Sequence, residues 1–123
     1  MSVEEEVLST LRTLVESIPV GDFDTYKKLT HENLTAFEPE SKSHLVEGLP
    51  FHEFFMNRPE KNAEFHTEMI NPVVKVFGDT AYAAYALVRI KYQDDKHDIS
   101  SVNETRIFHK FDSQWKMVHF HRS

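Results

Sequence analysis

The sequence contains no cysteine and only three glycines among its 123 residues. Without cysteine it has no disulfide, no thiolate metal site and no thiol nucleophile. Nor does it have a glycine-rich phosphate-binding loop. No segment approaches the roughly 18 consecutive apolar residues that a membrane-spanning helix needs, and no lysine–arginine run offers the basic surface typical of nucleic-acid binding. The acidic start, Glu4–Glu6, is unlike a signal peptide. We therefore expect a cytoplasmic protein with neither a membrane nor a nucleic-acid partner.

The composition that remains is that of a globular protein. Hydrophobic residues make up 40% of the chain and charged residues 28%, and the formal net charge is −6. A chain of this length buries enough surface for one hydrophobic core, but not for two. We predict a single domain over residues 1–123.

The first half of the chain shows helical signals. Apolar residues recur at three- and four-residue spacing over residues 3–18, which predicts an amphipathic helix with Ser2 as its cap and Glu5 as the reciprocal partner. A second helix is expected from Asp22 to about Leu29. An irregular segment should follow over residues 31–48, and a third short helix should begin at Pro50.

The second half shows the alternation and β-branched content of strands. The expected hairpin connections are tight turns at Gly78–Asp79 and Asp112–Ser113 and a polar tip at Asp94–Asp98. Helices followed by a run of antiparallel strands predict an α+β fold. The expected strands cover residues 66–77, 80–93, 99–111 and 114–122.

Three of the five arginines lie inside these strands. Arg12 is expected on the exposed side of the first helix and Arg58 in a loop, whereas Arg89, Arg106 and Arg122 belong to strands. Alternation places Arg106 beside Phe108, and Arg122 beside Val118 and Phe120, so both should point inward.

Guanidinium groups stay charged in proteins, and two of them about 6 Å apart repel by roughly 3 kcal/mol at an effective dielectric near 20. The Glu38 carboxylate could neutralise one of the three positive charges. The cluster could then hold a small carboxylate or phosphate. Alternatively, the arginines form separate ion pairs with acids such as Glu104 or Glu68. Spacing alone leaves both interpretations open.

The remaining polar candidates have equally open interpretations. His119 and His121 form a His-x-His pair that we place on one strand face with Trp115. Such a pair can hold zinc if His109 supplies a third ligand, or it can belong to an outer face that packs on a partner chain. Tyr26 lies among phenylalanines on a short helix, as does His52, where either could be a core residue or a ligand-binding residue.

Several segments in order resemble the association (hub) domain of calcium/calmodulin-dependent protein kinase II. The resemblance covers nearly the whole chain, and three of the segments (Phe-Glu-Pro-Glu, Val-Glu-Gly with Phe-His, and the closing Val-His-Phe-His-Arg-Ser) are specific. The segments are Gly21–Tyr26, Phe37–Glu40, Leu45–His52, Ile70–Pro72, Glu104–Arg106 and Val118–Ser123.

This resemblance implies a cone-shaped fold of the nuclear-transport-factor-2-like (SnoaL-like, cystatin-like) superfamily. A long N-terminal helix and short helices would wrap a curved antiparallel sheet. It also implies dimers that stack into two-tiered rings, and a pocket for small carboxylates. The family's arginine usually follows the tyrosine by two residues, so a one-residue register change or bulge is needed to bring Arg89 into the pocket. Matched by motif, the ligand-binding residues are Tyr26, Glu38, His52, Arg89, Arg106 and Arg122.

The expected function is therefore that of a stand-alone oligomerisation scaffold with an arginine-lined anion pocket. We expect no kinase catalytic domain, no cofactor and no resident metal. The partners would be further copies of the chain, a small carboxylate and, as a further candidate, a kinase that carries the same domain. The alternative is a small SnoaL-like isomerase, cyclase or dehydratase, in which His52 acts as general base and Glu38 or Tyr26 orients it. The expected dimer contact consists of Trp115, His119, His121 and Ile107.

Overall fold

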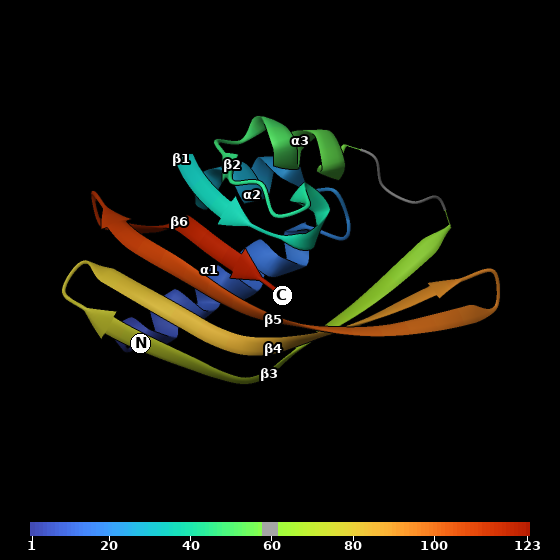
Figure 1. Ribbon diagram of the computed structural model, residues 1–123. Helices are drawn as coiled ribbons and strands as arrows, with labels where there is room; N and C mark the ends of the chain where they lie inside the picture. The colour runs from blue at the N-terminus through green and yellow to red at the C-terminus, as the bar shows by residue number, and fades with distance from the viewer. Residues whose placement is uncertain (58–61) are drawn as a thin grey trace.

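The computed structural model describes residues 1–57 and 62–123 (Figure 1). The loop expected around Arg58 lies outside the described residues. Helices and a single six-stranded sheet make up the fold, and the strand order is β2-β1-β6-β5-β4-β3. The elements are α1 (Val3–Ser17), α2 (Phe23–Lys28), β1 (Thr30–Phe37), the 3-10 helix η1 (Pro39–Ser41), β2 (Val46–Glu47), α3 (Pro50–Met56), β3 (Ala63–Phe77), β4 (Thr80–Gln93), β5 (Lys96–Phe111) and β6 (Gln114–Arg122).

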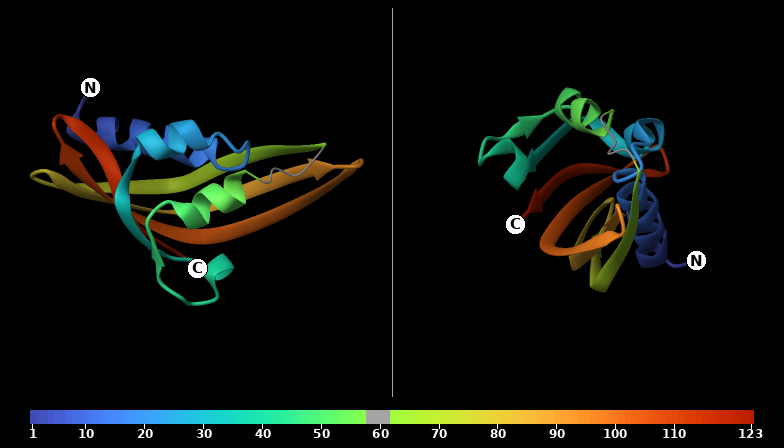
Figure 2. Two further views of the ribbon diagram at one scale, coloured as in Figure 1. Left: turned by 90° about the horizontal axis from the view of Figure 1, so that it is seen from above. Right: turned by 90° about the vertical axis from the view of Figure 1, so that its right-hand side faces the viewer.

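The sheet is curved, and its longest strands project beyond the helices (Figures 1 and 2). Strands β3 to β6 pair antiparallel, as the sequence predicts, and the α+β fold class is confirmed. Strand β1 pairs in parallel with β6 and antiparallel with β2. The prediction that residues 31–48 are irregular is therefore wrong, because the partner that orders β1 lies more than eighty residues away in the chain.

Helix α1 covers the inner face of the sheet and starts as expected. The Ser2 hydroxyl accepts a hydrogen bond from the Glu5 amide at 3.1 Å. Burial of its apolar stripe is the main source of its stability, because each fully buried aliphatic side chain contributes roughly 1.5–3 kcal/mol. The buried hydrophobic residues of this stripe are Val7, Leu11, Leu14 and Val15.

The β4–β5 connection is shorter than predicted. Only Asp94 and Asp95 form the turn, and β5 already begins at Lys96. Both aspartates have positive φ, at 52° and 61°, which is the backbone of the tightest two-residue hairpins. The result is a narrow tip at the end of two long strands.

A bulge in β6 decides which side chains face the core. Ile107 of β5 is opposite His119, whereas Phe108 is opposite Met117, so Val118 is an extra residue in β6. The alternation of faces reverses at that point. Trp115 is buried in the core together with Met117, and the prediction that it shares the outer face with His119 and His121 is wrong.

None of the helices in the described residues is long and apolar enough to cross a membrane. The core lies between the inner face of the sheet and the helices.

Candidate functional site

The three strand arginines come from neighbouring strands and lie on the inner side of the sheet. Arg106 is wholly buried (0% exposed), Arg122 is nearly buried, and Arg89 is half-buried. The β4–β5 register is continuous from Thr80 to Gln93, so the bulge expected before Arg89 is absent from β4. The strand positions alone bring the three guanidinium groups to one region.

Glu104 binds two of these arginines inside the protein. Its Oε1 is 3.2 Å from both Nε and Nη2 of Arg106, and its Oε2 accepts a hydrogen bond from Arg122 Nε at 2.8 Å. The Tyr85 hydroxyl donates to Glu104 Oε1 at 2.6 Å and accepts from Arg106 Nε at 3.0 Å. Arg122 Nη1 also donates to Glu40 Oε1 at 2.9 Å. Glu104 and Arg106 are two residues apart in β5, so they share a face.

The pKa values in this network follow from burial and charge. Burial by itself raises the pKa of Glu104, but attraction by Arg106 and Arg122 and hydrogen bonds from Tyr85 and Arg122 outweigh it and lower that pKa to about 2. Burial lowers the pKa of Arg106, but the attraction of Glu104 outweighs it, and the net shift is upward. Both groups are therefore charged at neutral pH.

A cavity of about 110 Å³ opens beside this network. Arg89 and Arg122 line it, whereas Arg106 is not among its lining residues. Of the six residues expected to bind a ligand, five therefore line the cavity, and Arg106 is not in its lining. The lining residues are Ile18, Tyr26, Glu38, Glu40, His52, Phe55, Met56, Arg89, Phe120 and Arg122.

His52 and Glu38 form a buried pair in the cavity wall. His52 Nε2 and Glu38 Oε2 are 2.8 Å apart, and both residues are buried. The His52 ring is held between the rings of Tyr26 and Phe120, whose centroids are 5.6 and 5.4 Å away. The Phe51 ring lies 5.5 Å away as well, so one hydrogen bond and three aromatic neighbours fix the orientation of the ring.

Several buried polar atoms around the cavity have no hydrogen-bond partner in the described part of the chain. They are Tyr26 Oη, His52 Nδ1 and Arg89 Nε, which all belong to cavity-lining residues. Arg106 Nη2, behind them, makes no hydrogen bond either, although it lies within ion-pair distance of Glu104. Burial raises the pKa of Tyr26 to about 12, so its hydroxyl stays protonated and can donate a hydrogen bond. A buried donor without an acceptor costs free energy.

The charges of the region nearly balance. Arg106 and Arg122 are paired with Glu104 and Glu40, while Glu38 is paired with His52. Among the described residues, no carboxylate lies within ion-pair distance of Arg89, although Glu104 and Glu40 attract it at longer range, and its guanidinium carbon is 5.9 Å from the centre of the Phe65 ring. Burial and the repulsion of Arg122 lower the pKa of Arg89. Arg89 is thus the one arginine of the three that has no ion pair with a carboxylate among the described residues.

The ion pairs bear out the second interpretation of the arginines for Arg106 and Arg122, and leave Arg89 without an ion pair among the described residues. Glu104 does pair with arginines, but it joins two of them into one network rather than forming a separate pair. Glu68 instead lies 2.8 Å from His66 on an exposed surface. Sequence reasoning missed Glu40 and Tyr85 as members of the network; the Glu-x-Arg spacing in β5 was the signal available for Glu104.

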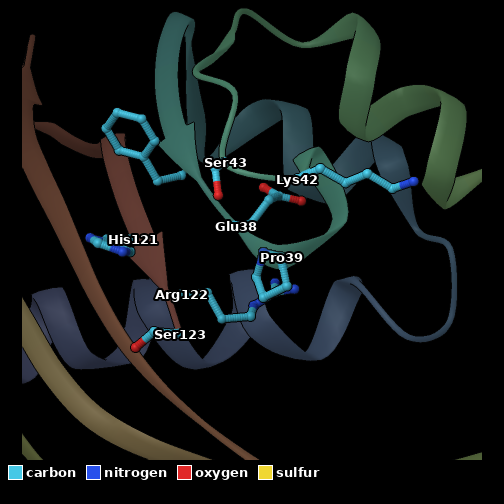
Figure 3. A pocket seen from close by; sticks show the side chains of 8 residues that line it. Glu38, Pro39, Lys42, Ser43, His121, Arg122 and Ser123 are labelled. Carbon is cyan, nitrogen blue, oxygen red and sulfur yellow. The ribbon is translucent and has the colours of Figure 1, made fainter.

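A second hollow, of about 460 Å³, lies on the other side of Glu38 and Arg122 (Figure 3). Both residues line it as well as the inner cavity, so their side chains form the wall between the two spaces. The Lys42 side chain points away from His121 and Arg122 in this view. Lys42 is nevertheless one of the residues that line the outer hollow.

The outer face of the sheet carries a separate group of residues. His119 lies opposite Ile107 and accepts or donates a hydrogen bond with the Thr35 hydroxyl at 2.7 Å, and the Phe37 ring lies beside both His119 and His121. This face therefore brings together three of the four residues expected at a dimer contact, without Trp115. Exposed neighbours on it that the sequence did not single out are Phe37, Val73, Phe77 and Tyr82.

Metal binding finds no support in the geometry. His109 is bonded to Thr80 at 3.0 Å, and no group of three histidine or carboxylate residues within residues 1–57 and 62–123 is arranged to hold a metal ion.

Comparison with known proteins gives a consistent result. The model of the "Calcium/calmodulin dependent protein kinase II association domain" family matches residues 3–123. The chain is 43% identical over 124 residues to the "Calcium/calmodulin-dependent protein kinase type II alpha chain" of Drosophila melanogaster, covering 97% of this chain but 23% of that protein. The chain thus spans about a quarter of that relative's length.

Solved structures agree with the sequence comparison. The C. elegans CaMKII association domain superposes with a TM-score of 0.90 at 34% identity, covering 97% of this chain and 93% of that chain. The S. rosetta CaMKII hub gives 0.88 at 35% identity, covering 100% and 97%. A nuclear-transport-factor-2-like protein from Cytophaga hutchinsonii, at 14% identity and a TM-score of 0.81, with 100% and 98% covered, shows the shared fold alone.

Proposed function

Because the chain belongs to the calcium/calmodulin-dependent protein kinase II association-domain family, whose members are oligomerisation modules, we propose that it assembles with further copies of itself and binds a small carboxylate in the inner cavity. The proposal that a ligand binds here rests on the buried polar atoms of Tyr26, His52 and Arg89 that have no hydrogen-bond partner. The proposal that the copies assemble rests on the exposed apolar outer face of the sheet.

The cavity limits what the ligand can be. Its volume of about 110 Å³ is well below the roughly 300–1,000 Å³ of pockets for drug-sized molecules. A nucleotide or steroid does not fit, whereas a short carboxylic acid does. The ligand carboxylate would pair with Arg89, and the Tyr26 hydroxyl would donate to it.

Substitution of Arg89 provides the sharpest test of the ligand. Arg106 and Arg122 hold the core together through Glu104, so their removal disturbs the fold as well as the cavity. Arg89→Gln removes the one unpaired guanidinium with less damage, and Arg12→Gln on the exposed face of α1 is its matched control. Butanoate should raise the melting temperature of the wild type and of Arg12→Gln, but not of Arg89→Gln. Equal shifts in all three would rule out the cavity as the site.

Self-association can be tested by substituting a residue on the outer face of the sheet. A glutamate in place of Ile107 puts a charge at the centre of the apolar surface, and desolvating that charge opposes association. Multi-angle light scattering should report a multimer for the wild type and a smaller species for Ile107→Glu. Val20→Glu, at an exposed apolar residue of the α1–α2 connection, is the control that should leave the mass unchanged.

One observation favours the alternative of a small enzyme. The Glu38 carboxylate orients His52 and leaves its Nδ1 without a partner, which is the arrangement of a base and its orienting group. If this pair abstracts a proton next to a carbonyl, a 3-oxo acid should be turned over by the wild type and not by His52→Gln. Absence of turnover in the wild type across such acids leaves binding as the role of the cavity.

A further inference from the structure

Half of the eight histidines of the chain lie together on the outer face of the sheet. His119 is opposite Ile107 of β5, and His121 follows two residues later in β6, so both belong to that face. The Thr35 hydroxyl is 2.7 Å from His119 Nδ1. The Phe37 ring lies 6.2 Å from the His119 ring and 5.9 Å from the His121 ring. The two imidazoles therefore lie on either side of one exposed phenylalanine.

The other two histidines of this group share a second aromatic ring. His109 is two residues beyond Ile107 in β5, and its ring is 4.9 Å from that of Phe111. His31 of β1 stacks on the same phenylalanine at 4.8 Å. His109 Nδ1 is also 3.0 Å from the Thr80 hydroxyl. We call these four residues of β1, β5 and β6 the outer histidines.

The surroundings of the outer histidines are apolar and offer them no paired acid. Within residues 1–57 and 62–123, none of the four forms an ion pair with a carboxylate. Lys116 is directly opposite His109, so it opposes a positive charge there. The exposed apolar side chains of this face are Phe37, Val73, Phe77 and Tyr82. The other titratable side chains on the face, or beside it in β1 and the hairpin turns, are Glu32, Glu47, Lys75, Asp79, Tyr82 and Asp112.

The charge of such histidines changes close to neutral pH. The ordinary pKa of the imidazole is about 6.5, so the ring is mostly neutral above pH 7 and mostly charged near pH 5. Burial, and to a lesser extent repulsion by His121, lower the pKa of His119, against a hydrogen bond with Thr35 that raises it. A neutral imidazole can be buried in an apolar contact, whereas an imidazolium without a carboxylate partner is costly to bury.

We propose that the outer histidines make the self-association of this chain reversible by acid: copies that are bound through the outer face at neutral pH separate as these side chains take up protons. The inference rests on the self-association through the outer face proposed above. Both copies bring the same rings to such a contact, so acid places positive charge on both of the surfaces that must meet.

Proton linkage fixes the direction and the size of the effect. A contact that buries neutral histidines lowers their pKa, so the separated copies bind more protons than the assembled ones, and a falling pH favours separation. Each histidine that must stay neutral weakens association by up to about tenfold per pH unit below its pKa. Because two copies each supply that histidine, one such position alone should weaken association about 100-fold between about pH 7.5 and about pH 5.5.

Light scattering of the whole chain at about pH 7.5 and about pH 5.5, at constant ionic strength, tests the proposal. The wild type should be a multimer at the higher pH and a smaller species at the lower. His119→Gln with His121→Gln removes two titrating rings and keeps polar side chains, so this variant should keep its mass in acid better than the wild type. His44→Gln with His97→Gln, at two exposed histidines outside the group, is the matched control and should respond to acid as the wild type does.

A second variant keeps the test valid if the first does not associate even at the higher pH. His31→Gln with His109→Gln removes the other two rings and should likewise reduce the response to acid. Circular dichroism at both pH values separates dissociation from unfolding, and all the variants should stay folded at the lower pH.

The outcomes distinguish this inference from the self-association on which it rests. A wild type that is monomeric at both pH values contradicts self-association itself. A folded assembly with the same mass at both pH values overturns the acid response and leaves self-association standing. So does an assembly that acid weakens equally in the wild type and in both variants of the outer histidines, because other groups would then take up the protons.

Discussion

Replacing Glu104 by glutamine tests the buried ion network directly, because it keeps the shape of the side chain and removes its charge. Arg106, which is wholly buried, then loses its carboxylate partner, and Arg122 keeps only Glu40. Removing one partner of a buried pair typically costs about 3–5 kcal/mol. We expect Glu104→Gln to lower the free energy of unfolding at pH 7 by an amount in this range.

The pKa of Glu104 leads to a similar magnitude by another route. A pKa of about 2 in the folded protein, against an ordinary value of 4.5, corresponds to roughly 3 kcal/mol at about 1.4 kcal/mol per pH unit. Because the folded pKa is the lower one, this stability is fully present above about pH 4.5. It is lost as the pH falls toward 2. The wild type should weaken steeply over that window, and Glu104→Gln should weaken less.

Glu40→Gln provides the matched control on the same arginine. Glu40 is also 2.9 Å from Arg122, but its side chain is 42% exposed, so its loss should cost less than about 1 kcal/mol. Urea unfolding followed by circular dichroism, at one protein concentration and at several pH values, measures both variants. If Glu104→Gln costs no more than Glu40→Gln at pH 7, the buried network does not stabilise the fold in the way described.

Three further changes have defined outcomes. Tyr85→Phe removes a hydroxyl that donates to Glu104 at 2.6 Å, so it should cost about 1–2 kcal/mol in urea unfolding and move the acid transition to higher pH. Ser2→Ala removes the cap of α1 and should cost about 1 kcal/mol, seen as a lower melting temperature, while Ser2→Asp should restore it. Phe120→Leu removes the ring 4.2 Å from the Arg106 guanidinium; we expect a loss of about 1–2 kcal/mol and weaker butanoate binding, and unchanged values for both would contradict the packing described.

Local patterns predict the elements that depend on neighbours in sequence. The capped start of α1 follows from Ser2 and the acidic first turn, and the strands over residues 80–93 and 114–122 match the structure to the residue. In each case the signals, which are the cap of the helix and the alternation and flanking turns of the strands, lie within the element or directly beside it. Such signals need no information about the rest of the chain.

Features that depend on distant contacts were missed or misplaced. Strand β1 lacks clear alternation and is ordered by β6, which lies at the other end of the sequence. The face of Trp115 is set by one extra residue, Val118, and nothing in the composition of β6 marks that bulge. The charge balance of the cavity depends on Glu40, which lies in the 3-10 turn far from the arginines in sequence. The sequence predicted that arginines would point inward, but not which carboxylates would form ion pairs with them.

The central position of β6 also has a consequence for how the protein is made. This strand lies between β1 and β5, yet it follows both of them in the sequence. During synthesis, β1 therefore leaves the ribosome more than eighty residues ahead of the strand it pairs with, and the apolar stripe of α1 emerges before most of the sheet that covers it. The pairing edges of β1 and β5 therefore stay open until β6 is made, and the sheet is completed only when β6 inserts between them.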